Sequence, residues 1–129
     1  MIHLHTHTHY SIHDSVVLPH VLIARCVELG MKKIAITDHG SMMGVVETAA
    51  IGEQEGVFVI PGIEAYIGRQ HVTLLAYNEQ GYVNLLKMPP RLKSIEELPT
   101  EGIICLSGCS LKGVVPNAKE PEIVAAKLK

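Results

Sequence analysis

The chain lacks several features that would place it in other classes of protein. It has no Trp and one Phe among 129 residues, so aliphatic side chains must build its core. No apolar run approaches the roughly 20 residues that a membrane-spanning helix needs. The N-terminus has no basic region followed by an apolar stretch, so we expect no signal peptide. The formal net charge of -2 gives no bulk attraction for nucleic acid, so any DNA contact must be local.

Cysteine is also scarce. The three cysteines, Cys26, Cys105 and Cys109, form an odd number without a disulfide pattern, so a reducing cytoplasm is the simplest location. A length of 129 residues with 47% hydrophobic content is enough to bury a core. We therefore expect a single globular domain over residues 1–129.

Histidine, in contrast, is concentrated at the N-terminus, at every second position from His3 to His9. In an extended strand such residues share one face, at intervals of roughly 7 Å. Neutral imidazole is the commonest metal ligand in proteins. Because Ile2, Leu4 and two threonines separate the histidines, the segment reads as a strand over residues 2–7 rather than a tag remnant.

Apolar strands alternate with amphipathic helices along the rest of the chain. Periodicity predicts helices over 19–29 and 41–54, a short one after Asn78, a helical turn at 95–98 and the start of another at 122–128. Apolar runs predict strands over 33–37, 57–60, 71–76 and 102–107, with 63–67 extended and 108–117 a loop. This alternation indicates an α/β fold with a parallel sheet covered on both faces.

Side chains that can bind a metal fall near the ends of these strands. They are His5 and His7, Asp14 in the next loop, Asp38 and His39, Glu64, and Cys109. In an α/β barrel the carboxyl ends of the strands form the active-site rim, so these residues should meet there. His71 opens its predicted strand, so either that boundary is misplaced or His71 enters from an antiparallel or irregular segment.

Each of these residues also has a structural interpretation. His3 lies lower in its strand and suits a core or supporting position, and Asp38 could cap a helix or orient a neighbour. Cys105 lies within an apolar run and reads as a core residue, and Cys109 alone would read the same way. For His9, His13 and His20 the structural interpretation is a surface side chain in contact with solvent. The whole set near successive strand ends is what indicates a metal site.

Several segments resemble one known family. They are residues 3–8 with Tyr10-Ser11, 36–40 (Ile-Thr-Asp-His-Gly), 61–66 (Pro-Gly-Ile-Glu-Ala-Tyr), 71–76, 78–86 and 106–109 (Leu-Ser-Gly-Cys). In this order they resemble the PHP (polymerase and histidinol phosphatase) domain, in the form found at the N-terminus of bacterial DNA polymerase III alpha subunits. The resemblance extends to about residue 116.

The resemblance implies a distorted TIM-like barrel of seven βα units, of which this chain holds about the first five, with up to three metal ions. By position, the first ion is held by His5, His7 and Glu64, the second by Glu64, His71 and Cys109, and the third by Asp14 and His39. Zinc, manganese and iron all suit these ligands, and the Cys favours zinc.

One departure from the family matters. The family carries a later Asp-x-His motif that completes the first and third ions, and the 129 residues contain none. We therefore expect incomplete first and third sites. We also expect the isolated chain to self-associate, because about five strands cannot close the barrel and would leave strand edges and apolar faces exposed.

The resemblance implies phosphoester hydrolysis, with DNA and a polymerase core or proofreading partner as partners. The reaction expected of the polymerase branch is 3′–5′ exonuclease hydrolysis of a DNA end, with Glu64 binding metal and His39 or Asp38 orienting or moving a proton. Two alternatives stay open. One is a stand-alone phosphatase acting on a small phosphomonoester such as histidinol phosphate, and the other is an inactive metal-binding scaffold or fragment.

Overall fold

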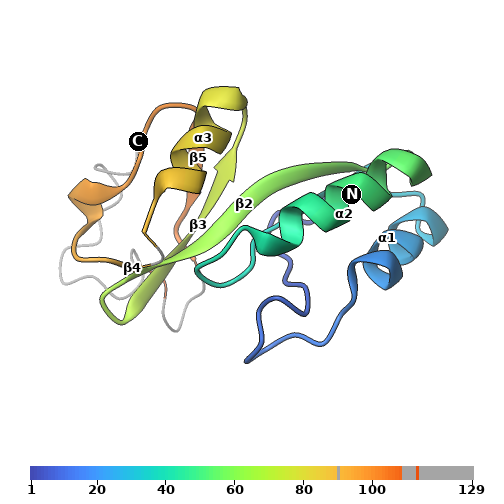
Figure 1. The fold of residues 1–129 in the computed structure, drawn as a ribbon, viewed down its shortest axis with the longest axis horizontal. Helices are drawn as coiled ribbons and strands as arrows, with labels where there is room; N and C mark the ends of the chain where they lie inside the picture. Colours follow the sequence, from blue (N-terminus) through green and yellow to red (C-terminus); the bar gives the residue numbers. More distant parts are fainter. Residues whose placement is uncertain (90, 109–112, 114–129) are drawn as a thin grey trace.

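The computed structural model describes residues 1–89, 91–108 and 113 (Figure 1). Its elements are α1 (Pro19–Glu28), β1 (Lys33–Ile36), α2 (Met43–Glu55), β2 (Phe58–Ile67), β3 (Gln70–Ala76), α3 (Glu79–Lys87), β4 (Arg91–Leu92), the 3₁₀ helix η1 (Ile95–Glu97) and β5 (Ile103–Leu106). The helix predicted over 122–128, and most of the loop predicted over 108–117, lie outside the described residues. None of the described helices is both long and apolar enough to cross a membrane.

Strand β2 organises the sheet, because it pairs with β1, β3 and β4. Its first half pairs in parallel with β1, from Phe58 opposite Lys33 to Pro61 opposite Ile36. Its second half pairs with β3 in antiparallel orientation, starting at Gly62, and with β4 in parallel. Strand β5 extends the sheet from β3. Figure 1 shows β2 running from the pair of helices α1 and α2 to its hairpin with β3.

The helices cover one face of this sheet. Alternate residues of β2 point to opposite faces, and Val59, Ile63 and Ala65 belong to the buried core. Val59 packs with residues of α1, α2 and β1, whereas Ile63 and Ala65 pack with residues of α3 and β3. Met42 and Tyr82 pack against both groups, so the two clusters form one continuous layer. The opposite face of β2 is left to carry Glu64.

The strand predicted over residues 2–7 is not formed as a regular strand. His3 makes a single parallel bridge to Ile34, and the backbone bends at the next two residues before Thr6 bonds to Thr37. The bend interrupts the ladder of hydrogen bonds that a strand needs. The N-terminal segment nevertheless lies beside β1, where the sequence pattern placed it.

The strand predicted over 57–60 and the extended segment predicted over 63–67 are one strand, because β2 continues through Pro61 and Gly62. Pro61 cannot donate a hydrogen bond, but β3 pairs only from Gly62 onward, so no β3 residue lies opposite Pro61. Gly62 is required by close packing, since a Cβ there would lie 2.7 Å from the Leu74 carbonyl oxygen. The sheet is also mixed rather than parallel, because the short turn after β2 returns the chain antiparallel as β3.

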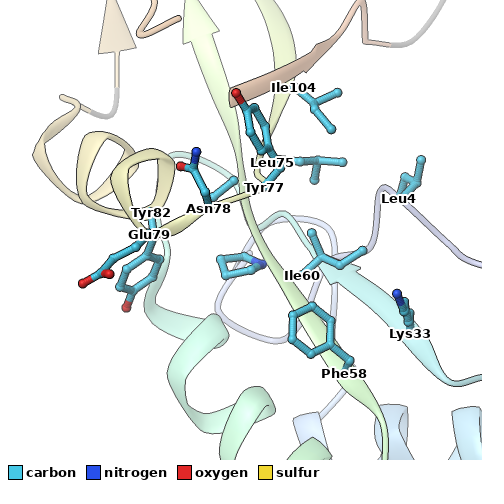
Figure 2. A pocket seen from close by; sticks show the side chains of 12 residues that line it. Leu4, Lys33, Phe58, Ile60, Leu75, Tyr77, Asn78, Glu79, Tyr82 and Ile104 are labelled. Carbon is cyan, nitrogen blue, oxygen red and sulfur yellow. The ribbon is translucent and has the colours of Figure 1, made fainter. Parts of the chain in front are cut away.

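The first half of β2 borders a large apolar pocket, shown in Figure 2. Its volume is about 530 Å³, and Leu4, Phe58, Ile60, Leu75, Tyr77 and Ile104 are among its lining residues. Phe58 is 62% exposed, and no strand pairs with this half of β2 on the side away from β1 among the described residues. The described strands therefore form an open sheet, as expected for part of a barrel.

Candidate metal centre

The parallel register between β1 and β2 places His39 beside Glu64. Ile36 is opposite Pro61, and three residues further along both segments His39 is opposite Glu64, in an isolated parallel bridge. Two backbone hydrogen bonds hold this bridge, from Glu64 N to Asp38 O and from Gly40 N to Glu64 O. On the other side of β2, Glu64 is opposite Thr73 of β3. Three separate segments thus meet at one point of the sheet.

His71 reaches the same point because β3 is antiparallel. It is opposite Tyr66, on the same side of β3 as Thr73, so it is a diagonal neighbour of Glu64. The antiparallel alternative considered from the sequence is therefore the observed one. His71 Nδ1 lies 3.0 Å from Glu64 Oε1.

Glu64 is the centre of a cluster of four imidazoles. Its carboxylate is 2% exposed and lies 3.0 Å from ring nitrogens of His7, His39 and His71 and 3.3 Å from His5 Nε2. His5 and His7 approach each other to 2.9 Å between their Nε2 atoms. The two rings therefore lean toward each other, with centres 4.9 Å apart.

A second group adjoins the first and shares His7. Asp14 Oδ2 lies 3.1 Å from His7 Nδ1 and 2.6 Å from His39 Nε2. His7 and His39 therefore each face Glu64 with one ring nitrogen and Asp14 with the other. Two sets of possible ligands result, His5–His7–Glu64 and His7–Asp14–His39, and within each set the ligand atoms lie within 4.8 Å of one another.

The two carboxylates and the imidazoles shift one another's protonation. Burial alone would raise the pKa of Glu64, but hydrogen bonds from His5 and His7 and the charges of His39 and His71 hold that pKa well below its ordinary value. Burial of His7 favours its neutral form, yet Glu64 and Asp14 outweigh burial and raise the His7 pKa. Partial burial likewise opposes ionisation of Asp14, but His7 and His39 lower its pKa. The two carboxylates are therefore held in their ionised form by the imidazoles around them.

Asp38 is fully buried and supports the loop that follows His7. Its carboxylate accepts hydrogen bonds from Thr8 N at 2.6 Å, Thr8 Oγ1 at 2.8 Å and Ser11 Oγ at 3.1 Å. Ser11 Oγ in turn accepts from His39 N at 2.9 Å. The backbone of α2 approaches closely here, since a Cβ on Gly44 would lie 2.2 Å from Asp38 Oδ2. These contacts support the positioning interpretation of Asp38.

The other residues named from the sequence lie elsewhere or outside the described chain. His3 is exposed, and none of His3, His9, His13 and His20 joins the two ligand groups among the described residues. Cys109 lies outside the described residues. Burial raises the pKa of the Cys105 thiol to about 11, as expected of a core residue.

Sequence reasoning missed two polar neighbours of the cluster. The Tyr66 hydroxyl lies 3.0 Å from His39 Nδ1, and Thr73 Oγ1 lies 3.4 Å from His5 Nδ1. Tyr66 lies two residues after Glu64 on β2, and Thr73 lies two residues after His71 on β3, so each shares a face of the sheet with a residue of the cluster. Once the antiparallel hairpin is known, this spacing of two residues identifies both.

The donor set fits a divalent transition metal. Imidazole and carboxylate ligands suit zinc, manganese and iron, and a buried carboxylate facing several imidazoles is the kind of anionic pocket that a cation would stabilise. Among the residues that the structure describes, the apolar pocket beside Phe58 has only Lys33 and Glu79 as charged lining residues, so these offer no comparable ligand set. We therefore place the candidate site at Glu64.

Comparison with known proteins agrees with this geometry. The family model described as the PHP domain matches residues 3–127, so the chain belongs to the PHP domain family. The DNA polymerase III subunit alpha of Borreliella burgdorferi is 34% identical over 143 aligned residues, and that of Helicobacter pylori strain 26695 is 36% identical over 137. The matches cover 90% and 88% of this chain but only 12% and 11% of the relatives' own length.

A solved structure shares the fold. An amidohydrolase from Chromobacterium violaceum, with bound sulfate and no metal, has a TM-score of 0.51 and 26% sequence identity to this chain. The match covers 66% of this chain and 32% of the amidohydrolase. The α/β fold class predicted from the sequence is therefore confirmed, with the mixed sheet described above.

Proposed function

We propose that this chain is the metal-dependent phosphoesterase domain of a DNA polymerase III alpha subunit and acts on phosphodiester bonds at the 3′ end of DNA. The observation that carries the proposal is the convergence of two ligand groups on the shared His7, next to the buried Glu64. The named relatives support the choice of DNA over other phosphoesters.

The candidate ligands would form three metal-binding sites. His5, His7 and Glu64 would hold one divalent ion, Asp14 and His39 would hold another with His7, and Glu64 and His71 would hold a third together with Cys109. Bound divalent ions supply hydroxide near neutral pH and neutralise charge on the phosphoryl oxygens. Zinc, manganese and iron are all candidates on these ligands.

His39 is the proposed proton carrier. Its Nε2 lies 2.6 Å from Asp14 and its Nδ1 lies 3.0 Å from both Glu64 and the Tyr66 hydroxyl. With Nε2 toward the ion that Asp14 would hold, Nδ1 is the nitrogen left to carry a proton, and Glu64 and the Tyr66 hydroxyl lie next to it. Asp38 is assigned the positioning role, because both of its oxygens already accept hydrogen bonds from the loop at Thr8 and Ser11.

The proposal includes the partners and location that it implies. DNA and a polymerase core or proofreading partner are the expected partners, in the cytoplasm. The family's Asp-x-His motif does not occur in these 129 residues, so we expect this segment alone to bind metal more readily than it hydrolyses DNA.

The test uses a 5′-labelled single-stranded oligonucleotide with manganese or zinc, with p-nitrophenyl phosphate as the small phosphomonoester. Shortening from the 3′ end that disappears in His7→Gln and persists in His20→Gln supports the proposal. His20 is a matched control because it is exposed on α1 and belongs to neither ligand group. Turnover of p-nitrophenyl phosphate alone would instead support the small-substrate alternative, and metal binding without either activity would support the scaffold.

A further inference from the structure

Arg91 presents a positive charge beside the candidate site. It is the first residue of β4, exposed, and pairs in register with Tyr66 of β2. Its guanidinium carbon lies 4.8 Å from the centre of the Tyr66 ring, and Nη1 donates to the Gly68 carbonyl oxygen. No carboxylate in the described part of the chain forms an ion pair with it.

Tyr66 connects this arginine to the ligand cluster. The Tyr66 and His39 rings are nearly parallel, at 14° and 5.4 Å between centres, and the Tyr66 hydroxyl lies 3.0 Å from His39 Nδ1. With the guanidinium 4.8 Å from the same Tyr66 ring, Arg91 lies within about 10 Å of His39. One aromatic side chain therefore separates a fixed cation from the proposed metal ligands.

This placement has a chemical consequence for substrate binding. A nucleic-acid strand brings a further phosphate beside the one that the metal ions would face, and that phosphate gains from a cation close to the site. The planar guanidinium matches a phosphate group, and a ring and a carbonyl that already fix its position reduce the entropy lost on binding. If Arg91 served only to pack over the Tyr66 ring, it would bind no phosphate.

We propose that Arg91, oriented by Tyr66, binds a second phosphate of the substrate, next to the phosphodiester at the metal centre. The substrate class is then a strand of nucleic acid rather than a phosphomonoester. This inference rests on the proposed function of the site, and it assigns the side chain that would select a strand.

The test measures binding of 5′-fluorescein-labelled dT8 by anisotropy over a range of salt concentrations, both in EDTA and with manganese. Arg91→Gln should weaken binding by roughly tenfold, since a charged hydrogen-bond donor is lost. The slope of log K against log salt should fall in magnitude by about 0.7, the value for one phosphate contact on a single strand. A lost structural contact would not change that slope, and Arg91→Lys should keep it while lowering affinity.

Two controls make the outcome decisive. Arg69→Gln removes the same charge from an exposed residue of the neighbouring turn and should leave the slope unchanged. Competition with thymidine 5′-monophosphate, which has one phosphate, should be equally strong in the Arg91→Gln variant and the unmodified chain. An unchanged slope, equal loss for both ligands, or no binding of dT8 by the unmodified chain would overturn the proposal.

The design also separates this inference from the proposed function. An effect of Arg91 on dT8 binding that persists in EDTA supports the phosphate site even if no metal is bound. Metal binding that is normal in Arg91→Gln, together with unaltered dT8 affinity, would refute the phosphate site and leave the metal centre standing.

Discussion

The replacement Asp38→Asn tests how the fold holds the ligand-bearing loop. Asp38 is fully buried and accepts three hydrogen bonds from Thr8 and Ser11. An Asn side chain keeps one acceptor oxygen and turns an amide group toward donors. Since a hydrogen bond to a charged group contributes about 1.5–3 kcal/mol, we expect the free energy of unfolding to fall by about 2 kcal/mol. In a chain of this size that corresponds to a decrease in Tm of about 8 °C.

The assay is urea unfolding of the metal-free chain, followed by far-ultraviolet circular dichroism. Asp14→Asn is the matched control, because Asp14 is exposed and its ion pairs should contribute less than about 1 kcal/mol. A double-mutant cycle with Thr8→Val should give a coupling energy of about 1 kcal/mol between Thr8 and Asp38. If Asp38→Asn and Asp14→Asn lower stability equally, Asp38 does not anchor this loop.

Four further predictions concern the ligand cluster and the open sheet. Gly44→Ala should destabilise the chain although Ala favours helices, because the added Cβ would collide with the Asp38 carboxylate. Urea unfolding measures this, and a gain in stability would refute the packing argument. The metal-free chain should lose stability as pH falls below about 4.5, because Glu64 has a lowered pKa when folded and the unfolded state takes up its proton first. Acid unfolding monitored by circular dichroism checks this, and Glu64→Gln should reduce the dependence, leaving the smaller part that comes from Asp14. Metal affinity should rise with pH through and above 6.5, since the raised pKa of His7 lets protons compete with the metal for that ligand. Calorimetric titration with metal at several pH values measures this, and an affinity that does not change with pH would contradict it. The isolated chain should self-associate through its open sheet, and Phe58→Thr should reduce this in sedimentation velocity, whereas a monodisperse unmodified chain would contradict it.

The helices and inner strands were predictable because their signals are local. Pro19 and the periodic apolar residues that follow it predict α1, and the apolar run at Lys33–Ile36 predicts β1. The N-terminal histidines illustrate the limit of local reasoning. Alternation predicts that His5 and His7 share a face, but it does not predict the bend at Leu4 and His5, which lies between the backbone hydrogen bonds from Ala35 to His3 and from Thr37 to Thr6.

Pairing between strands was not predictable from the residues alone. The convergence of His39, Glu64 and His71 requires the parallel register of β1 with β2 and the antiparallel register of β3. Local sequence specifies neither register, because each depends on the whole hydrophobic face that the strand buries. Tyr66 and Arg91 became visible as neighbours of the site only through these registers.

Metal content per chain tests the central claim most directly. The purified chain is dialysed without chelator, separated by gel filtration and analysed for its elements. We expect at least one equivalent of zinc, manganese or iron, lost in His7→Gln because His7 belongs to both ligand groups, and retained in His20→Gln. No bound metal in the folded chain, or equal loss in both variants, would contradict the assignment of this cluster as a metal centre.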